Sequence, residues 1–143
     1  MNHEIITLLE KHFVKPTPMR MLVLEQFVIN NNSLSLDEIE NLLYPSDRIT
    51  IYRTLNTFEK NGLIHKIENQ NKGTNYALCS NECDIENHID THPHFFCEKC
   101  LKIFCTDIFK FKIEENQLTS RYLVKNINIK ITGICDKCLK ISN

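Results

Sequence analysis

The chain has 143 residues, of which 42% are hydrophobic and only three are glycine, a composition typical of a folded protein rather than a disordered one. Its formal net charge of −1, from 17 basic and 18 acidic residues, excludes the overall basic character of many nucleic-acid-binding proteins. No segment approaches the roughly 18 consecutive apolar residues of a membrane span, and the amphipathic N-terminus lacks the pattern of a signal peptide. We therefore expect a cytoplasmic protein with no membrane contact.

The seven cysteines indicate metal binding rather than a disulfide framework. Their number is odd, and a chain without an export signal stays in a compartment where thiols are kept reduced.

Two amphipathic helices are predicted at the start of the chain. Residues 2–13 carry hydrophobic side chains at helical spacing, and the two prolines of segment 15–18 end that helix. Thr17 and Pro18 then supply an N-cap and a first-turn proline for a second helix. Its hydrophobic stripe consists of Met21, Leu24, Phe27 and Val28.

Two shorter helices follow, and together they predict a helix-turn-helix. Residues 35–38, Ser-Leu-Asp-Glu, form a capping box that begins one helix, which Pro45 closes. That helix contains Ile39, Leu42 and Leu43. Asp47 can cap the next helix, and Gly62 suits the position just after its C-terminus. Its hydrophobic face is Ile51, Leu55 and Phe58, and its other side carries Arg48, Tyr52 and Arg53, as in a DNA-recognition helix.

The rest of the chain is predicted to be rich in β-structure. Segments 63–68 and 74–79 flank a turn and predict a β-hairpin, or wing. Segment 94–105 predicts a strand pair around a Cys-x-x-Cys turn, and segment 108–123 predicts a helix. Segment 126–135 alternates isoleucines with polar residues, the period of a half-buried strand, and leads into a second Cys-x-x-Cys turn.

The two Cys-x-x-Cys turns predict a structural zinc site formed by Cys97, Cys100, Cys135 and Cys138. Four thiolates complete the closed tetrahedral shell of structural zinc, so we expect removal of the metal to unfold the C-terminal half. Two unrelated redox or buried thiol pairs are the alternative. A zinc deaminase is disfavoured, because its signature requires His-x-Glu and a proline before the first cysteine of the pair, where this chain has Phe96.

A second metal site is predicted from residues of both halves. His92 and His94 alternate on a strand-like segment, so their rings point to one face, and the hairpin can bring His65 near Cys79. Three imidazoles and one thiolate suit zinc better than iron(II) or manganese(II).

Alternatives to this second site remain open. Each histidine can instead be a structural core or surface residue. Cys105 or His88 can replace one ligand, and Cys83 is unassigned, so these three residues are candidates for an additional metal site.

Four segments together resemble the ferric uptake regulator (Fur) family of bacterial metal-dependent repressors. They are KPTPMRMLVL, ITIYRTLNTFEKNGLI, HPHFFCEKC and GICDKC. The resemblance covers nearly the whole chain and implies an α+β protein. It implies a winged helix-turn-helix DNA-binding domain at residues 1–80, a hinge at 81–90, and a small α/β dimerisation and metal-binding domain at 91–143. It also implies a homodimer that binds double-stranded operator DNA, a structural zinc on the four cysteines, a regulatory metal at the hinge, and no catalysis.

The resemblance also implies DNA contacts. By position, Lys15 corresponds to the family's minor-groove residue, Tyr52 and Arg53 to its recognition-helix contacts, and Arg20 to a basic position of the motif. Arginine can read guanine or hold phosphate, and tyrosine can contact a thymine methyl or a phosphate. Packing of Tyr52 on its helix neighbours is the alternative. The full set of DNA-binding candidates is Lys15, Arg20, Arg48, Thr50, Tyr52 and Arg53.

Departures from the iron-responsive branch bear on the regulatory metal. Ser33, Ala77 and Cys105 stand where iron-responsive members usually have a histidine and two glutamates. Thr91 and Pro93 stand where many of them have His and Asp for an additional site.

By contrast, GLIHKIE and NYALC are similar to the zinc uptake regulators, which implies a sensing site at His65, Cys79, His92 and His94. We therefore predict a zinc-responsive repressor of metal-uptake genes. The alternatives are an iron-, manganese- or peroxide-responsive regulator of the same fold, a thiol-based redox sensor and, last, a zinc enzyme.

Overall fold

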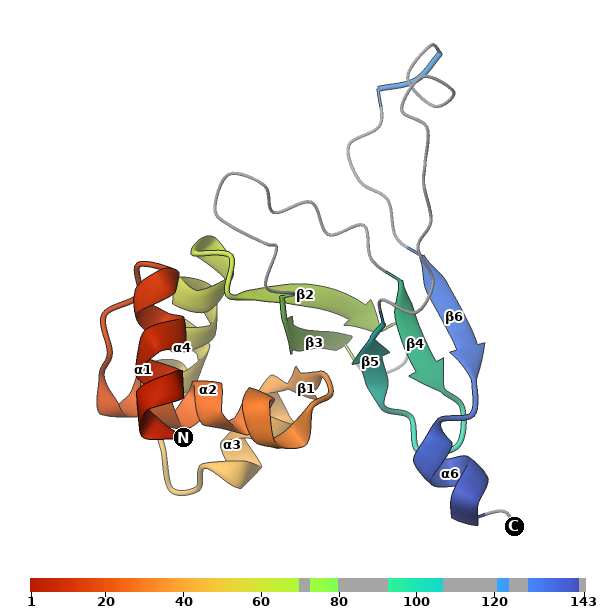
Figure 1. Cartoon of the computed structure of the whole chain (residues 1–143), viewed down its shortest axis with the longest axis horizontal. Helices are drawn as coiled ribbons and strands as arrows, with labels where there is room; N and C mark the ends of the chain where they lie inside the picture. Colours follow the sequence, from red (N-terminus) through yellow and green to blue (C-terminus); the bar gives the residue numbers. More distant parts are fainter. Residues whose placement is uncertain (70–72, 80–92, 107–120, 124–128, 142–143) are drawn as a thin grey trace. The chain divides into compact units, whose positions relative to one another are not determined.

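The computed structural model describes residues 1–69, 73–79, 93–106, 121–123 and 129–141 (Figure 1). The chain divides into two compact units, Met1–Ile89 and Asp90–Asn143, called here the first and the second unit. The predicted domain limits stay a prediction, because the predicted hinge 81–90 lies outside the described residues. No helix in the described ranges is long and apolar enough to cross a membrane.

The first unit contains four helices whose caps follow the predicted signals. They are α1 (Asn2–Lys11), α2 (Pro18–Asn30), α3 (Leu36–Leu42) and α4 (Arg48–Lys60). The side chain of Thr17 caps α2, Asp47 caps α4, and Ser35 and Glu38 form the predicted capping box of α3. Gly62 follows the end of α4 with a φ of 69°, the left-handed conformation that glycine adopts without a steric penalty.

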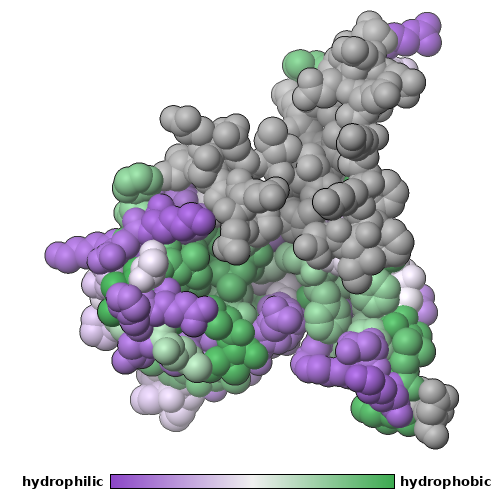
Figure 2. All heavy atoms as spheres, in the orientation of Figure 1, coloured by the Kyte–Doolittle hydropathy of each residue, from purple (hydrophilic) through white to green (hydrophobic). Residues whose placement is uncertain are grey.

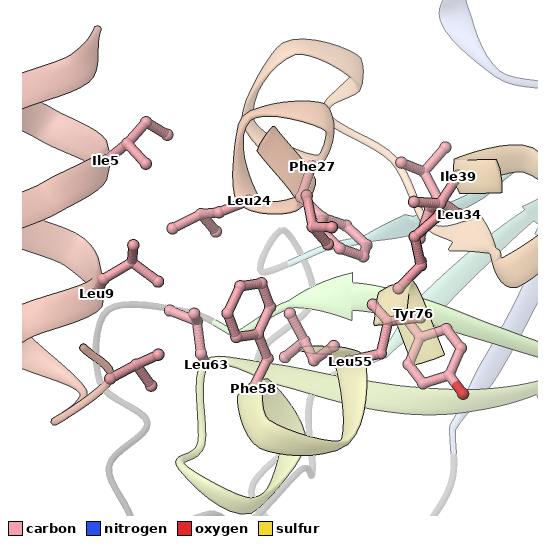
Figure 3. Close-up of a cluster of buried hydrophobic side chains, with 14 of the residues drawn as sticks. Ile5, Leu9, Leu24, Phe27, Leu34, Ile39, Leu55, Phe58, Leu63 and Tyr76 are labelled. Carbon is pink, nitrogen blue, oxygen red and sulfur yellow. The ribbon is translucent and has the colours of Figure 1, made fainter. Parts of the chain in front are cut away.

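The hydrophobic core of the first unit lies between these helices and one face of a small sheet. Figure 3 shows Ile5 and Leu9 of α1 pointing toward side chains from α2 and α4. Leu24, Phe27, Ile51, Leu55 and Phe58 are each at most 2% exposed. Leu42 is half exposed, so only Ile39 and Leu43 of its helix segment are buried. Val23 is fully buried although it was not placed in the α2 stripe, because α2 contacts neighbours over a wider face than one stripe.

The wing is a three-stranded sheet rather than a two-stranded hairpin. Strands β2 (Ile64–Asn69) and β3 (Gly73–Leu78) form the predicted antiparallel pair. A two-residue strand, β1 (Leu34–Ser35), which was not predicted, pairs with the other edge of β3, so the order is β1-β3-β2. Because β1 runs directly into α3, this pairing ties the start of the helix-turn-helix to the wing.

The second unit contains a second three-stranded sheet, with the order β5-β4-β6. The predicted strand pair is β4 (His94–Cys97) with β5 (Ile103–Cys105), and β6 (Lys130–Gly133) lies parallel to β4 on its other side. A short helix, α6 (Asp136–Ile141), begins inside the second Cys-x-x-Cys turn and was not predicted. The helix predicted over 108–123 lies almost entirely outside the described residues.

Candidate metal centre and nucleic-acid interface

The four cysteines of the two Cys-x-x-Cys turns come together in the second unit. Cys97 ends β4, and Gly133, its register partner in the parallel strand β6, lies two residues before Cys135. The carboxyl ends of parallel strands meet at one edge of a sheet, so both turns leave the sheet at the same place. All four sulfur atoms lie within 4.8 Å of one another. They form one cluster, which does not match two unrelated thiol pairs.

The geometry of this cluster fits a tetrahedral ion bound by four thiolates. A zinc–sulfur bond of about 2.3 Å places tetrahedral sulfurs about 3.8 Å apart. The Sγ atoms of Cys100 and Cys135 are separated by 3.8 Å. Six described cysteines, including these four, are thiols rather than disulfides. When bound, zinc would cross-link the two turns.

Backbone amides prepare one of these thiols for ionisation. The amide of Cys135 donates to Cys97 Sγ at 3.3 Å. The pKa of Cys97 is lowered to about 6, chiefly because the amide of Cys100 and then that of Cys135 stabilise the thiolate. Burial raises the pKa of Cys100, and it raises the pKa of Cys138 to about 12. Thiols of this kind ionise when a cation replaces their protons.

The turn that follows β4 is fixed by its own backbone bonds. The amide of Glu98 donates to the carbonyl of Gly133 at 2.8 Å, which joins this turn to the end of β6. Leu101 donates to the carbonyl of Cys97 at 2.9 Å and has a φ of 61°. The first pair of sulfurs is therefore held by local geometry as well as by the sheet.

Two candidate ligands of the regulatory metal meet within the wing of the first unit. His65 lies in β2 with only 2% of its surface exposed, and its Nδ1 is 3.4 Å from Cys79 Sγ. The amide of Cys79 continues the β2–β3 pairing by donating to the carbonyl of Leu63 at 3.0 Å. An imidazole nitrogen and a thiol sulfur at this distance are a pair of donors suited to zinc.

In the second unit, another two candidate ligands face each other across a strand pair. His94 of β4 is buried and is the register partner of Cys105 in β5. His92, His88 and Cys83 lie outside the described residues. A site that combines ligands from the two units stays a prediction.

The DNA-binding candidates differ in what holds them. Lys15, Tyr52 and Arg53 are exposed on the first unit. Thr50 belongs to the cap of α4, because its amide and its hydroxyl both donate to Asp47 at 2.9 Å. These bonds lower the pKa of Asp47, which favours its charged form at the helix N-terminus.

The other two candidates, Arg20 and Arg48, are engaged inside the first unit. Arg48 lies at the start of α4, and its guanidinium donates to Asp37 at 2.6 Å and to Glu40, both on α3. These hydrogen bonds raise the pKa of Arg48. Arg20 donates to the backbone carbonyl of Lys15 at 2.9 Å. Each arginine therefore supports a neighbouring segment through a bond that spacing along the sequence did not indicate.

One further ion pair, which the sequence did not indicate, joins the wing to α4. Lys66 Nζ of β2 lies 3.0 Å from a carboxylate oxygen of Glu59 on α4. The hydrogen bond to Glu59 raises the pKa of Lys66. No sequence periodicity links Glu59 and Lys66, so only the folded chain reveals this ion pair.

Across the visible face of the first unit, hydrophilic and hydrophobic side chains lie side by side (Figure 2).

Comparison with known proteins identifies the family. Residues 11–135 match the sequence profile of the ferric uptake regulator family. The chain belongs to this family. At the level of the family it is a transcription regulator and not an enzyme.

Relatives with different stimuli are about equally similar to this Fur-family chain. The peroxide-responsive repressor PerR of Staphylococcus epidermidis is 26% identical, covering 98% of this chain and 91% of that protein. The zinc uptake regulation protein of Escherichia coli K12 is 25% identical, covering 90% and 75%. A solved zinc uptake regulator complexed with zinc and DNA has the same fold, with a TM-score of 0.67, 21% identity and coverage of 98% and 93%.

Ser33, expected from the resemblance to stand where iron-responsive members have a histidine, has a structural role in this chain. Ser33 is 2% exposed, and its Oγ accepts a hydrogen bond from Asn75 Nδ2 of β3 at 3.1 Å. Asn32, also buried, donates to the carbonyl of Ser33 at 2.6 Å. This polar cluster adds hydrogen bonds between the segment before α3 and the wing.

Proposed function

We propose that this Fur-family chain is a zinc-responsive repressor that binds operator DNA as a homodimer and controls metal-uptake genes. The observation that supports zinc most directly is the contact between His65 Nδ1 and Cys79 Sγ, 3.4 Å apart. Nitrogen and sulfur donors suit zinc, whereas iron(II) and manganese(II) sites take more oxygen ligands. Ser33 and Ala77, where iron-responsive members have a histidine and a glutamate, are buried and supply no carboxylate.

In this proposal two zinc sites have different tasks. Cys97, Cys100, Cys135 and Cys138 hold a structural ion that stabilises the second unit. His65, Cys79, His92 and His94 hold the regulatory ion, for which zinc would supply a tetrahedral cross-link. Cys105 is an alternative ligand for this ion, because it is the register partner of His94.

The DNA-binding half of the proposal uses the exposed residues of the first unit. Arg53 and Tyr52 of α4 would contact bases and phosphates in the major groove, and Lys15 a neighbouring minor groove. A homodimer would place two α4 helices at the half-site spacing of a pseudo-palindromic operator. If the ligands close only in the DNA-competent state, metal strengthens DNA binding and DNA strengthens metal binding by the same factor.

A second candidate is a regulator that responds to iron, manganese or peroxide. The similarity to the peroxide-responsive repressor of Staphylococcus epidermidis, at 26% identity, favours it. Such a protein would require oxygen ligands from residues outside the predicted set.

Metal-dependent DNA binding tests the two candidates directly. The reduced chain is used to select an operator from random duplexes, and its affinity is then measured with zinc, iron(II) or manganese(II). We expect zinc to raise affinity at least tenfold. Cys79→Ser should lose most of this response, because serine replaces a thiolate donor by a weak neutral one.

Thr74→Ser, a change on the exposed part of the same hairpin, is the control and should respond like the wild type. Promotion of DNA binding by iron(II) or manganese(II) but not by zinc would favour the second candidate. An unchanged zinc response in Cys79→Ser would remove Cys79 from the regulatory site.

A further inference from the structure

Phe13 combines two features that are costly in a folded protein. Its side chain is 83% exposed, and its φ is 56°. Residues with a Cβ pay a steric penalty in this left-handed region. The penalty is larger for bulky residues than for asparagine, and glycine does not pay it. An exposed phenylalanine also gains little from the hydrophobic effect. Within the first unit, therefore, neither the backbone nor the ring of Phe13 explains this residue.

The backbone conformation is imposed by the way α1 ends. The amide of Phe13 donates to Glu10 at 3.0 Å, and the amide of Val14 donates to Leu9 at 2.9 Å. This is the Schellman arrangement, which usually has glycine where Phe13 lies. Leu9 and Val14 are both buried, the hydrophobic pair that often accompanies this motif. The chain thus turns at residue 13 in a left-handed conformation whatever the side chain is.

The residues on either side hold the ring outward. Val14 belongs to the hydrophobic core, and His12 is 6% exposed, with Nδ1 3.1 Å from the carbonyl of Asn61 at the end of α4. With both neighbours anchored in the unit, the Phe13 ring is directed to solvent from a fixed base. A rigidly presented aromatic side chain is preorganised for a partner.

The sequence on either side of Phe13 is basic. Between residues 10 and 20 the chain has three cations, Lys11, Lys15 and Arg20, against one acid, Glu10. Arg20 holds the backbone of Lys15 through its carbonyl at 2.9 Å, which fixes the turn that carries this lysine. An exposed apolar ring two residues before an exposed lysine whose backbone is held matches a surface that offers both sugar faces and phosphates. DNA is such a surface.

We propose that Phe13 is a DNA contact, whose ring packs against the sugar walls of the minor groove beside a phosphate held by Lys15. This inference rests on the proposed function, operator binding by the first unit. Phenylalanine is among the side chains that proteins place in or between the steps of the minor groove. On this proposal the Phe13 ring makes its contact only in the complex with DNA. That contact explains why the chain keeps a strained, exposed phenylalanine at residue 13.

Phe13→Gly separates this role from a structural one, because the two roles predict opposite outcomes. Glycine relieves the left-handed strain, and this gain offsets the destabilising rise in unfolded-state entropy, so Tm should stay level or rise. Operator affinity should fall about tenfold, since the ring contact is lost. The salt slope of binding should not change, because no charge is removed, whereas Lys15→Ala should reduce it by about 1.

Two further variants complete the experiment. Phe13→Tyr keeps a ring on the same backbone and should bind within about twofold of the wild type, a change of about 0.4 kcal/mol. Ile29→Ala removes another exposed hydrophobic side chain, on α2, and should bind like the wild type. Tm and affinity are measured on the full metal-loaded chain.

Unchanged affinity in Phe13→Gly, or an equal loss in Phe13→Tyr and Phe13→Gly, would overturn the inference, and so would a clear fall in Tm for the glycine variant. A wild-type chain that selects no duplex under any metal condition would overturn the proposed function itself, and this inference with it. Binding of the wild type with a glycine variant of equal affinity would refute only the role of Phe13.

Discussion

Arg48 and Arg53 lie on the same helix, and their surroundings give them different tasks. Arg48 bonds Asp37 and Glu40 of α3, so its charge is largely compensated inside the helix-turn-helix. Arg53 is exposed on α4, and of these two arginines it is the one left available to a phosphate or a base. Both arginines were predicted as DNA contacts, because sequence spacing alone does not show which cation has an acidic neighbour.

The salt dependence of operator binding distinguishes these arginines. Each phosphate contact that is lost reduces the slope of log affinity against log salt by about 1. We expect Arg53→Ala to weaken binding strongly and reduce the slope, while zinc content stays intact. Arg48→Ala should leave the slope unchanged and lower Tm slightly, because it removes a bond between α3 and α4. An equal fall in slope for both variants would show that Arg48 leaves its carboxylates to contact DNA.

At the scale of single elements, α3 depends on a cap that also belongs to a strand. Ser35 ends β1, and its Oγ accepts the amide of Glu38 at 3.2 Å, while Glu38 accepts the amide of Ser35 at 2.7 Å. The local sequence predicted the capping box. It did not predict β1, because two residues become a strand only when β3 lies beside them.

Loss of this cap should be measurable in the stability of the first unit. Replacement of an N-cap serine by alanine costs about 1 kcal/mol, with a range of roughly 0.5–2. We expect Ser35→Ala to lower the free energy of unfolding by that amount in chemical denaturation followed by circular dichroism. Ser35→Thr keeps a capping hydroxyl and should lose clearly less. A neutral alanine variant would mean that the β1–β3 pairing alone is enough to start α3.

At the scale of the whole molecule, the two units are stabilised by different means. The first unit has a core of fifteen buried residues drawn from its four helices, its sheet and the segments that connect them. In the described part of the second unit, a buried cluster consists of Cys97, Cys135 and Cys138, with Phe95 and Phe104 packed against it. Because this buried cluster consists of candidate metal ligands, we expect the second unit to need a bound metal to remain folded.

Metal removal should therefore affect the two units unequally. In hydrogen exchange followed by mass spectrometry, we expect chelation or Cys135→Ser to remove protection from segments 93–106 and 129–141. Segments of α1, α2 and α4 should keep theirs, because their amides lie in a core without metal ligands. Cys105→Ser, outside the four-cysteine cluster, should leave that protection in place. Equal loss in both units would show that the first unit also depends on the structural ion.

The sequence by itself determined the features that depend on near neighbours. Helix caps, the turn at Gly62, the wing hairpin and strand β6 (Lys130–Gly133) are set by residues within a few positions of one another, so local pattern predicted them. The two Cys-x-x-Cys turns also predicted the four-cysteine cluster, because paired turns with this two-residue spacing are typical of metal sites.

Only the tertiary structure decided which groups meet across long stretches of chain. It placed both cysteine turns at one edge through the parallel pairing of β4 and β6, and added β1 to the wing. In the folded chain, Arg48 also pairs with Asp37 of α3, and Arg20 donates to the Lys15 carbonyl. Phe13 is exposed between two buried neighbours. These outcomes depend on pairings between residues that are distant in sequence. A local sequence pattern cannot predict them, because it does not show which distant residues folding brings together.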